Sequence, residues 1–176
     1  MNRVIRKAQA HSSGEASSLL AALMATELLQ PSKCLWLISP WISDLILLDN
    51  SAGTYDALRR WGSRPIRLAE ILATLLSSSA TVVIATTPDP RNRRFLDRLL
   101  SLAKDARRDD RLSVFEDQSN MLHAKSIVAD DFALLGSMNL TYTGVHLREE
   151  YLELRTEPEF VAEARISAFE SFGGVL

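Results

Sequence analysis

Four polar side chains in the second half of the sequence have the types and the spacing needed for phosphodiester chemistry. His123 and Lys125 are two residues apart, and Ser137 and Asn139 repeat that spacing a dozen residues later. Residues two apart in a β-strand lie on the same face, so each pair predicts a shared surface. An imidazole, an ammonium, a hydroxyl and an amide together offer a phosphate a nucleophile or base, a fixed positive charge and neutral donors.

A β-hairpin would bring the two pairs together. Segments 122–129 and 132–138 are apolar and favour strands, and Asp130-Asp131 between them favours a turn. Apolar runs and turn signals predict further strands at 34–38, 81–87, 112–115 and 151–154. Helical periodicity and capping signals predict helices between Ser12 and Pro31 and at 66–76, 91–106 and 158–169, with a surface loop at 50–63. This order predicts an α/β fold, a mixed β-sheet flanked by helices on both faces, in a single domain over residues 1–176.

The composition argues against several functional classes. A formal charge of −2 argues against binding nucleic acid by bulk charge alone, although a local basic patch is compatible with it. The single cysteine, Cys34, excludes an intramolecular disulfide and predicts a reducing cytoplasm. Three histidines without an H-E-x-x-H pattern predict no metal site, and no cofactor is expected. The apolar stretch 35–48 is too short to span a bilayer, so neither secretion nor membrane insertion is predicted.

The order of the polar residues resembles a known family signature. His123-x-Lys125-x4-Asp130, followed by Gly136-Ser137-x-Asn139, is similar to the motif of the phospholipase D superfamily. The segment Ile38-Ser39-Pro40-Trp41 resembles the end of the family's opening strand, which lies beside the active site. More narrowly, the length, the N-terminal layout and the arginine-rich middle resemble the small phospholipase D-like component of bacterial 7-deazapurine-in-DNA modification and restriction clusters.

Two features differ from the family pattern. Five residues instead of six separate Asp130 from the glycine, so the hairpin must be one residue tighter. Arg148 stands where the family has an asparagine shortly before its glutamate. Counting from Asn139 places that glutamate at Glu150, with Glu149 as the alternative.

The resemblance implies an α-β-α sandwich and a metal-independent phosphodiesterase. His123 would attack phosphorus and form a covalent phosphohistidine, and a second histidine would protonate the leaving oxygen. Lys125 and Asn139 would bind phosphate oxygens, while Glu150 would hydrogen-bond His123 and orient it. Ser137 is equally compatible with a direct phosphate contact and with closing the hairpin. Asp130 and Gly136 are expected to support the hairpin.

A second histidine is required by this chemistry, yet the chain carries one motif. Neither His11 nor His146 is followed by a lysine two residues later. We therefore expect a homodimer in which two-fold symmetry places two copies of His123 across one phosphate.

Candidate substrate-binding residues lie near the ends of the first predicted strands. Arg91, Arg93 and Arg94 follow a Pro-Asp-Pro bend, where ligand-contacting loops often lie in α/β sheets. They are candidates for phosphate contacts on DNA, although acidic neighbours also fit a solvated helix face. Trp41 and Ser39 are candidates because they follow strand 34–38; for the tryptophan, the alternative is packing without a substrate contact.

Three functions fit these residues. The first is a nuclease acting on DNA, as part of a DNA modification or restriction complex with other proteins. The second is a phospholipase D-like subunit that binds DNA or partner proteins with little catalysis. A phospholipid hydrolase is the least favoured, because the sequence has no evident lipid-interface helix or basic membrane patch.

Overall fold

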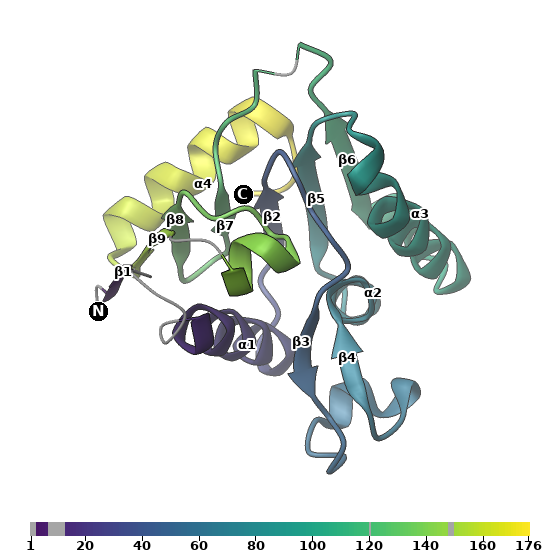
Figure 1. Ribbon diagram of the computed structural model, residues 1–176. Coiled ribbons are helices and arrows are strands. Elements are labelled where there is room, and N and C mark those ends of the chain that lie inside the picture. Colours follow the sequence, from purple (N-terminus) through teal and green to yellow (C-terminus); the bar gives the residue numbers. More distant parts are fainter. Residues whose placement is uncertain (1–2, 7–12, 120, 148–149) are drawn as a thin grey trace.

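The computed structural model describes residues 3–6, 13–119, 121–147 and 150–176. A seven-stranded sheet with the order β1-β9-β8-β7-β2-β5-β6 forms its centre (Figure 1). The strands are β1 (Arg3–Arg6), β2 (Cys34–Ile38), β5 (Thr81–Thr86), β6 (Leu112–Glu116), β7 (Ser126–Val128), β8 (Ala133–Gly136) and β9 (Tyr151–Arg155). β2, β5 and β6 pair in parallel and the remaining pairs are antiparallel, so the sheet is mixed, as predicted.

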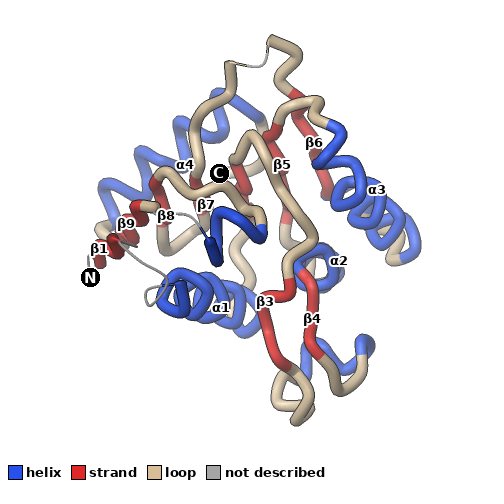
Figure 2. The backbone as a smooth tube through the Cα atoms, in the orientation of Figure 1, coloured by secondary structure: helices blue, strands red, loops and turns tan. Residues whose placement is uncertain are grey.

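Helices cover both faces of this sheet (Figures 1 and 2). One face carries α1 (Ser13–Leu29), α2 (Leu68–Ser77) and α3 (Pro90–Asp105), whose apolar side chains share a core with Leu35 and Leu37 of β2. On the other face, α4 (Pro158–Phe172) packs over Trp36. Because alternate residues of a strand point to opposite faces, the entirely apolar β2 contributes to both cores. The predicted fold class is confirmed. Within the described ranges, no helix is both long and apolar enough to cross a lipid bilayer.

The hairpin β7–β8 has the predicted turn but shorter strands. Ala129 N–H donates to the Phe132 carbonyl at 2.9 Å, so the turn contains only Asp130 and Asp131. Ser126 pairs with Leu135 at the other end of the hairpin. The two-residue turn accommodates the short spacing between Asp130 and Gly136.

Two parts of the fold were not predicted. β3 (Ile46–Asp49) and β4 (Pro65–Arg67) form a separate two-stranded sheet, and a 3-10 helix (Asp56–Trp61) lies inside the predicted loop 50–63. Because β4 takes residues 65–67, α2 begins at Leu68 and not at residue 66. The second part is β1, which pairs with β9 at the edge of the main sheet. Ser12, the predicted start of the capping motif of α1, lies outside the described residues.

Candidate active site

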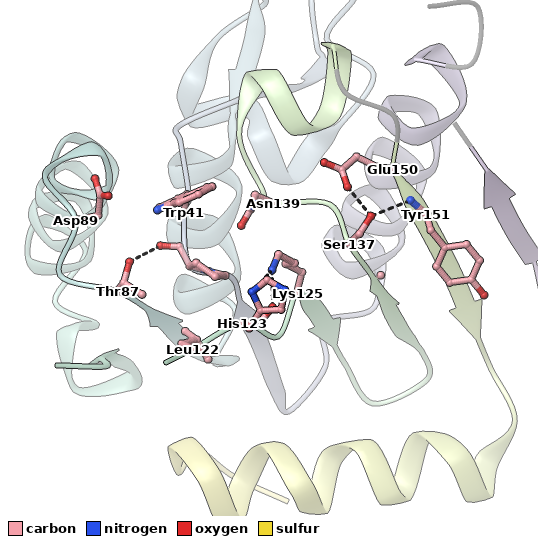
Figure 3. Close-up of a pocket in the computed structure, with 12 residues that line it drawn as sticks. Trp41, Thr87, Asp89, Leu122, His123, Lys125, Ser137, Asn139, Glu150 and Tyr151 are labelled. Atoms are coloured by element: carbon pink, nitrogen blue, oxygen red, sulfur yellow. Dashed lines mark hydrogen bonds between the residues drawn. The ribbon is translucent and has the colours of Figure 1, made fainter. Parts of the chain in front are cut away.

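Several strand ends meet at one edge of the sheet. Because β7 runs antiparallel to β2, the carboxyl ends of β2, β5 and β8 lie beside the amino ends of β7 and β9. A cavity of about 940 Å³ opens at this edge (Figure 3). Its lining is Pro40, Trp41, Thr87, Asp89, Leu122, His123, Lys125, Gly136, Ser137, Asn139, Glu150 and Tyr151. All five residues predicted for the catalytic site are in this set.

His123 and Lys125 lie in the extended segment before β7 and not within the strand, which corrects the prediction. Their side chains converge nevertheless. Lys125 Nζ lies 3.3 Å from His123 Nδ1 and donates to the His123 carbonyl oxygen at 2.5 Å. Partial burial lowers the pKa of Lys125, and the Glu150 carboxylate opposes this shift. The exposed imidazole and the half-buried ammonium therefore face one cavity together.

Ser137 joins the end of β8 to the start of β9. Its Oγ donates to Glu150 Oε2 at 2.5 Å and accepts from Tyr151 N–H at 3.0 Å, and its own N–H donates to the Tyr151 carbonyl at 3.0 Å. Gly136 permits this approach, because a Cβ there would overlap the Tyr151 carbonyl oxygen. The partner that we predicted for Glu150 was His123, whereas the structure places Ser137 at its carboxylate. Arg148 and Glu149 lie outside the described residues.

Asn139 is a buried amide at the rim of the cavity, and Ser39 is its support. The single Ser39 hydroxyl proton is shared between Asn139 Oδ1, 3.2 Å from Oγ, and the Trp41 carbonyl, 2.9 Å from Oγ. Ser39 is fully buried and is not among the residues that line the cavity. Its prediction as a substrate contact is therefore corrected to a positioning contact. Because Oδ1 is occupied, Asn139 has its amide NH₂ left to offer to an anion.

Asn92 of α3 fixes the loop after β2, a role that sequence reasoning missed. Its Nδ2 donates to the Pro40 carbonyl at 2.9 Å and its Oδ1 accepts from Ile42 N–H at 2.9 Å. The Thr86 and Thr87 hydroxyls donate to the same Pro40 carbonyl at 3.0 and 2.8 Å. These buried bonds fix the backbone of the residues before and after Trp41. A single asparagine in a helical pattern does not indicate such a role in the sequence.

Trp41 forms one wall of the cavity (Figure 3), which is the position that a substrate contact would need. The Arg91 guanidinium lies over its ring, 4.3 Å from the centroid, and pairs with Asp89 at 2.6 Å. The Arg91 side chain and N–H, which both donate to Asp89, lower the pKa of Asp89 to about 2. Asp89, which also caps α3, was not predicted as a site residue.

The two other predicted arginines differ in position. Arg94 lines a smaller cavity that it shares with Arg67 and Arg91. Arg93 is exposed on α3 and is not among the residues that line this cavity or the larger one.

Asp130 lies at the opposite end of the hairpin from the cavity. Its carboxylate accepts from Lys33 N–H at 2.9 Å and forms an ion pair with Arg165 of α4 at 3.0 Å, while its own N–H donates to Ser32 Oγ at 3.0 Å. It therefore ties the hairpin turn to the start of β2 and to α4, in agreement with the predicted supporting role.

His146 is not among the residues that line the cavity. His146 belongs to a short π-helical turn (Thr143–Leu147), and its ring centroid lies 4.6 Å from that of Tyr142. His11 lies outside the described residues. Among the residues that the structure describes, no three His, Cys, Asp or Glu side chains are grouped so that they could hold a metal ion.

Comparisons with known proteins agree on the fold. No family model and no curated protein matches the sequence. Among solved structures, NucT from Helicobacter pylori superposes with a TM-score of 0.61 at 13% identity, with 99% of each chain covered. The phospholipase D family member Nuc from Salmonella typhimurium gives 0.62 at 11% identity, over 97% of this chain and 92% of that one. Phosphatidylserine synthase from Haemophilus influenzae Rd KW20 gives 0.58 at 18% identity, over 87% of this chain and 35% of that one. The chain thus has a phospholipase D-like fold.

Proposed function

We propose that this protein is a phospholipase D-like phosphodiesterase that cleaves DNA. The observation that carries the proposal is the meeting of His123, Lys125 and Asn139 at one cavity, beside the strand ends that the fold brings together. The likeness to NucT and Nuc supports the assignment at the level of the fold.

The proposed reaction has two displacements at phosphorus. In the first, a ring nitrogen of His123 forms a bond to phosphorus while the bond to the leaving oxygen breaks, and that oxygen takes a proton from a second imidazole. In the second, the second imidazole takes a proton from water, the water oxygen attacks phosphorus, and the bond to His123 breaks. Splitting the displacement in this way lowers each barrier.

Two groups of the chain are placed to stabilise charge on the phosphate. The Lys125 ammonium would exchange its contacts with His123 for a phosphate oxygen. The Asn139 amide NH₂ would donate to a second oxygen, because Ser39 holds its carbonyl end. Once Lys125 leaves His123 Nδ1, that nitrogen needs a new partner, and Glu150 is our candidate if it releases Ser137.

The second imidazole is proposed to be His123 of an identical subunit. A two-fold axis through the cavity would place both copies on opposite sides of one phosphate. We further propose that the dimer acts in the cytoplasm with other proteins of a DNA modification or restriction system, as the sequence resemblance implies.

Cleavage in the presence of a chelator tests the proposal. Plasmid and single-stranded DNA are incubated with the purified protein in excess EDTA, beside His123→Ala and the matched control His146→Ala. We expect cleavage by the parent and by His146→Ala, and none by His123→Ala. DNA retention without cleavage by any of the three would support the alternative, a binding subunit. Cleavage that survives His123→Ala would refute the catalytic assignment.

A further inference from the structure

A second cavity adjoins the first and shares Trp41 with it. It measures about 350 Å³, within the range of about 300–1,000 Å³ that is usual for ligand pockets. Two aromatic side chains, Trp41 and Tyr142, line it together with Arg91. Three residues with hydroxyls, Ser43, Thr141 and Thr143, also line it. It also shares Asn139 and Glu150 with the first cavity, so the two are continuous at the proposed phosphate position.

A third cavity, of about 200 Å³, continues from the second through Ser43 and Arg91. Three guanidinium groups line it, those of Arg67, Arg91 and Arg94, together with the single carboxylate of Asp44. That carboxylate already accepts from Ala69 N–H and faces Arg98 at 3.4 Å.

The three arginines of this cavity differ in the bonds that their side chains already make. Arg91 is paired with Asp89, and Arg67 donates to the Asp44 carbonyl at 2.7 Å. The Arg94 guanidinium has no hydrogen bond or ion pair within the part of the chain that the structure describes, so it is the group available to an anion.

We infer that the second and third cavities form a nucleotide subsite. The base and sugar of the nucleotide next to the scissile bond would occupy the second cavity, and its other phosphate would bind Arg94 in the third. This inference deepens the proposed function and rests on it. Along a polynucleotide, a phosphate is followed by a sugar with its base and then by the next phosphate. The three cavities offer groups that match this order: the proposed phosphate position, then aromatic and hydroxyl groups, then guanidinium groups. An acyl chain would meet hydroxyls and then guanidinium groups, which fit it poorly.

Trp41 is suited to act as the stacking surface of this subsite. The bonds of Asn92 to both sides of Trp41 fix the backbone. Arg91, which lines the second cavity with Trp41, lies over the ring, so a base in this cavity would stack against the layer that the indole and the guanidinium form. A fixed aromatic surface loses little conformational entropy when a base stacks on it. Stacking of this kind is sequence-tolerant, because every base has a π-face.

Binding to a catalytically silent protein tests the subsite separately from cleavage. In a His123→Ala background, the affinity for a fluorescein-labelled single-stranded oligonucleotide is measured by anisotropy across a salt series. We expect Trp41→Ala to weaken binding about tenfold or more, and Trp41→Phe to recover part of it. Arg94→Ala should reduce the salt slope by about 1, whereas Arg108→Ala, at an exposed arginine beyond the end of α3, should not.

The outcomes separate the subsite from the proposed function. Unchanged affinity and salt slope in Trp41→Ala and Arg94→Ala would overturn the subsite. So would binding of phosphatidylglycerol vesicles by the parent without binding of the oligonucleotide. Hydrolysis of bis(p-nitrophenyl) phosphate by the chain with His123 intact reports on the first cavity alone. If this chain does not hydrolyse bis(p-nitrophenyl) phosphate but shows the expected binding pattern, the proposed phosphodiesterase activity would be overturned and the subsite supported.

Discussion

Gly136→Ala is expected to damage both the stability and the site, because the strands β8 and β9 leave no room for a side chain there. A Cβ would overlap the Tyr151 carbonyl oxygen and would lie 3.0 Å from its carbon and 3.2 Å from Leu152 Cα. These are backbone atoms, which cannot rotate away, so the two strands must separate.

The cost follows from two terms. Overpacking of this kind destabilises by about 1–3 kcal/mol. Separation also breaks the bond from Ser137 N–H to the Tyr151 carbonyl, which contributes about 0.5–1.5 kcal/mol. We expect a total loss of about 1.5–4.5 kcal/mol, which is large against the usual stability of about 5–15 kcal/mol. The proposed phosphodiesterase activity should fall as well, because Glu150, just before β9, moves away from Ser137 and Lys125.

Urea unfolding followed by tryptophan fluorescence measures the effect, with Gly14→Ala as the matched control. Gly14 lies exposed in the first turn of α1 with no atom near the position of a Cβ, so the same substitution should stabilise the protein by about 0.4–1 kcal/mol, because alanine restricts the unfolded chain. A loss below about 1 kcal/mol at Gly136 would refute the claim that β8 and β9 require a glycine.

Three further outcomes are expected. Asn92→Ala should lower the free energy of unfolding by about 2–4 kcal/mol in the same urea assay, because Ile42 N–H and the Thr87 carbonyl each lose the buried partner that Asn92 gives them; a loss under about 1 kcal/mol would contradict this. Cys34 should resist a thiol reagent at neutral pH until the chain unfolds, since burial raises the pKa of its thiol to about 11; rapid labelling of the folded protein would disprove it. Burial raises the pKa of Glu27 above its ordinary 4.5, so the folded chain binds that proton more tightly than the unfolded chain and stability falls as the pH rises through this range. Glu27→Gln should therefore gain stability over the parent as the pH rises from 4 to 7, and a constant difference would contradict the shift.

The strands that the sequence predicts best are those buried on both faces. β2 and β5 are continuous apolar runs that end at Pro40 and Pro88, and their observed bounds match the prediction to within a residue. Such runs carry their own signal, because each residue meets an apolar layer.

The elements that the sequence does not predict depend on their partners. β1 has four residues, and they pair with β9 more than a hundred positions later, so no local pattern announces it. β3 and β4 stabilise each other as a short hairpin around a 3-10 helix, and β4 has only three residues, which is too few for an alternating pattern. Short strands of this kind form because tertiary contacts outweigh weak propensities.

The residues of the candidate site also differ in how far the sequence predicts them. The types and order of His123, Lys125 and Asn139 are visible in the sequence, because their spacing matches a motif. The contact between Ser137 and Glu150 depends on the side-chain rotamers at two strand ends. Ser39 and Asn92 support the site as single buried polar residues, which belong to no periodic sequence pattern. Neither can be derived from spacing alone.

The distribution of the cavity residues along the chain bears on when the protein becomes active during synthesis. The lining begins at Pro40 and ends at Tyr151, so the cavity stays open on one side until β9 has left the ribosome. At about 5–20 residues per second, roughly 5–20 s separate the emergence of these two positions. A nascent chain that carries only β2, β5 and β7 holds His123 and Lys125 without Glu150, and so it lacks the complete cavity.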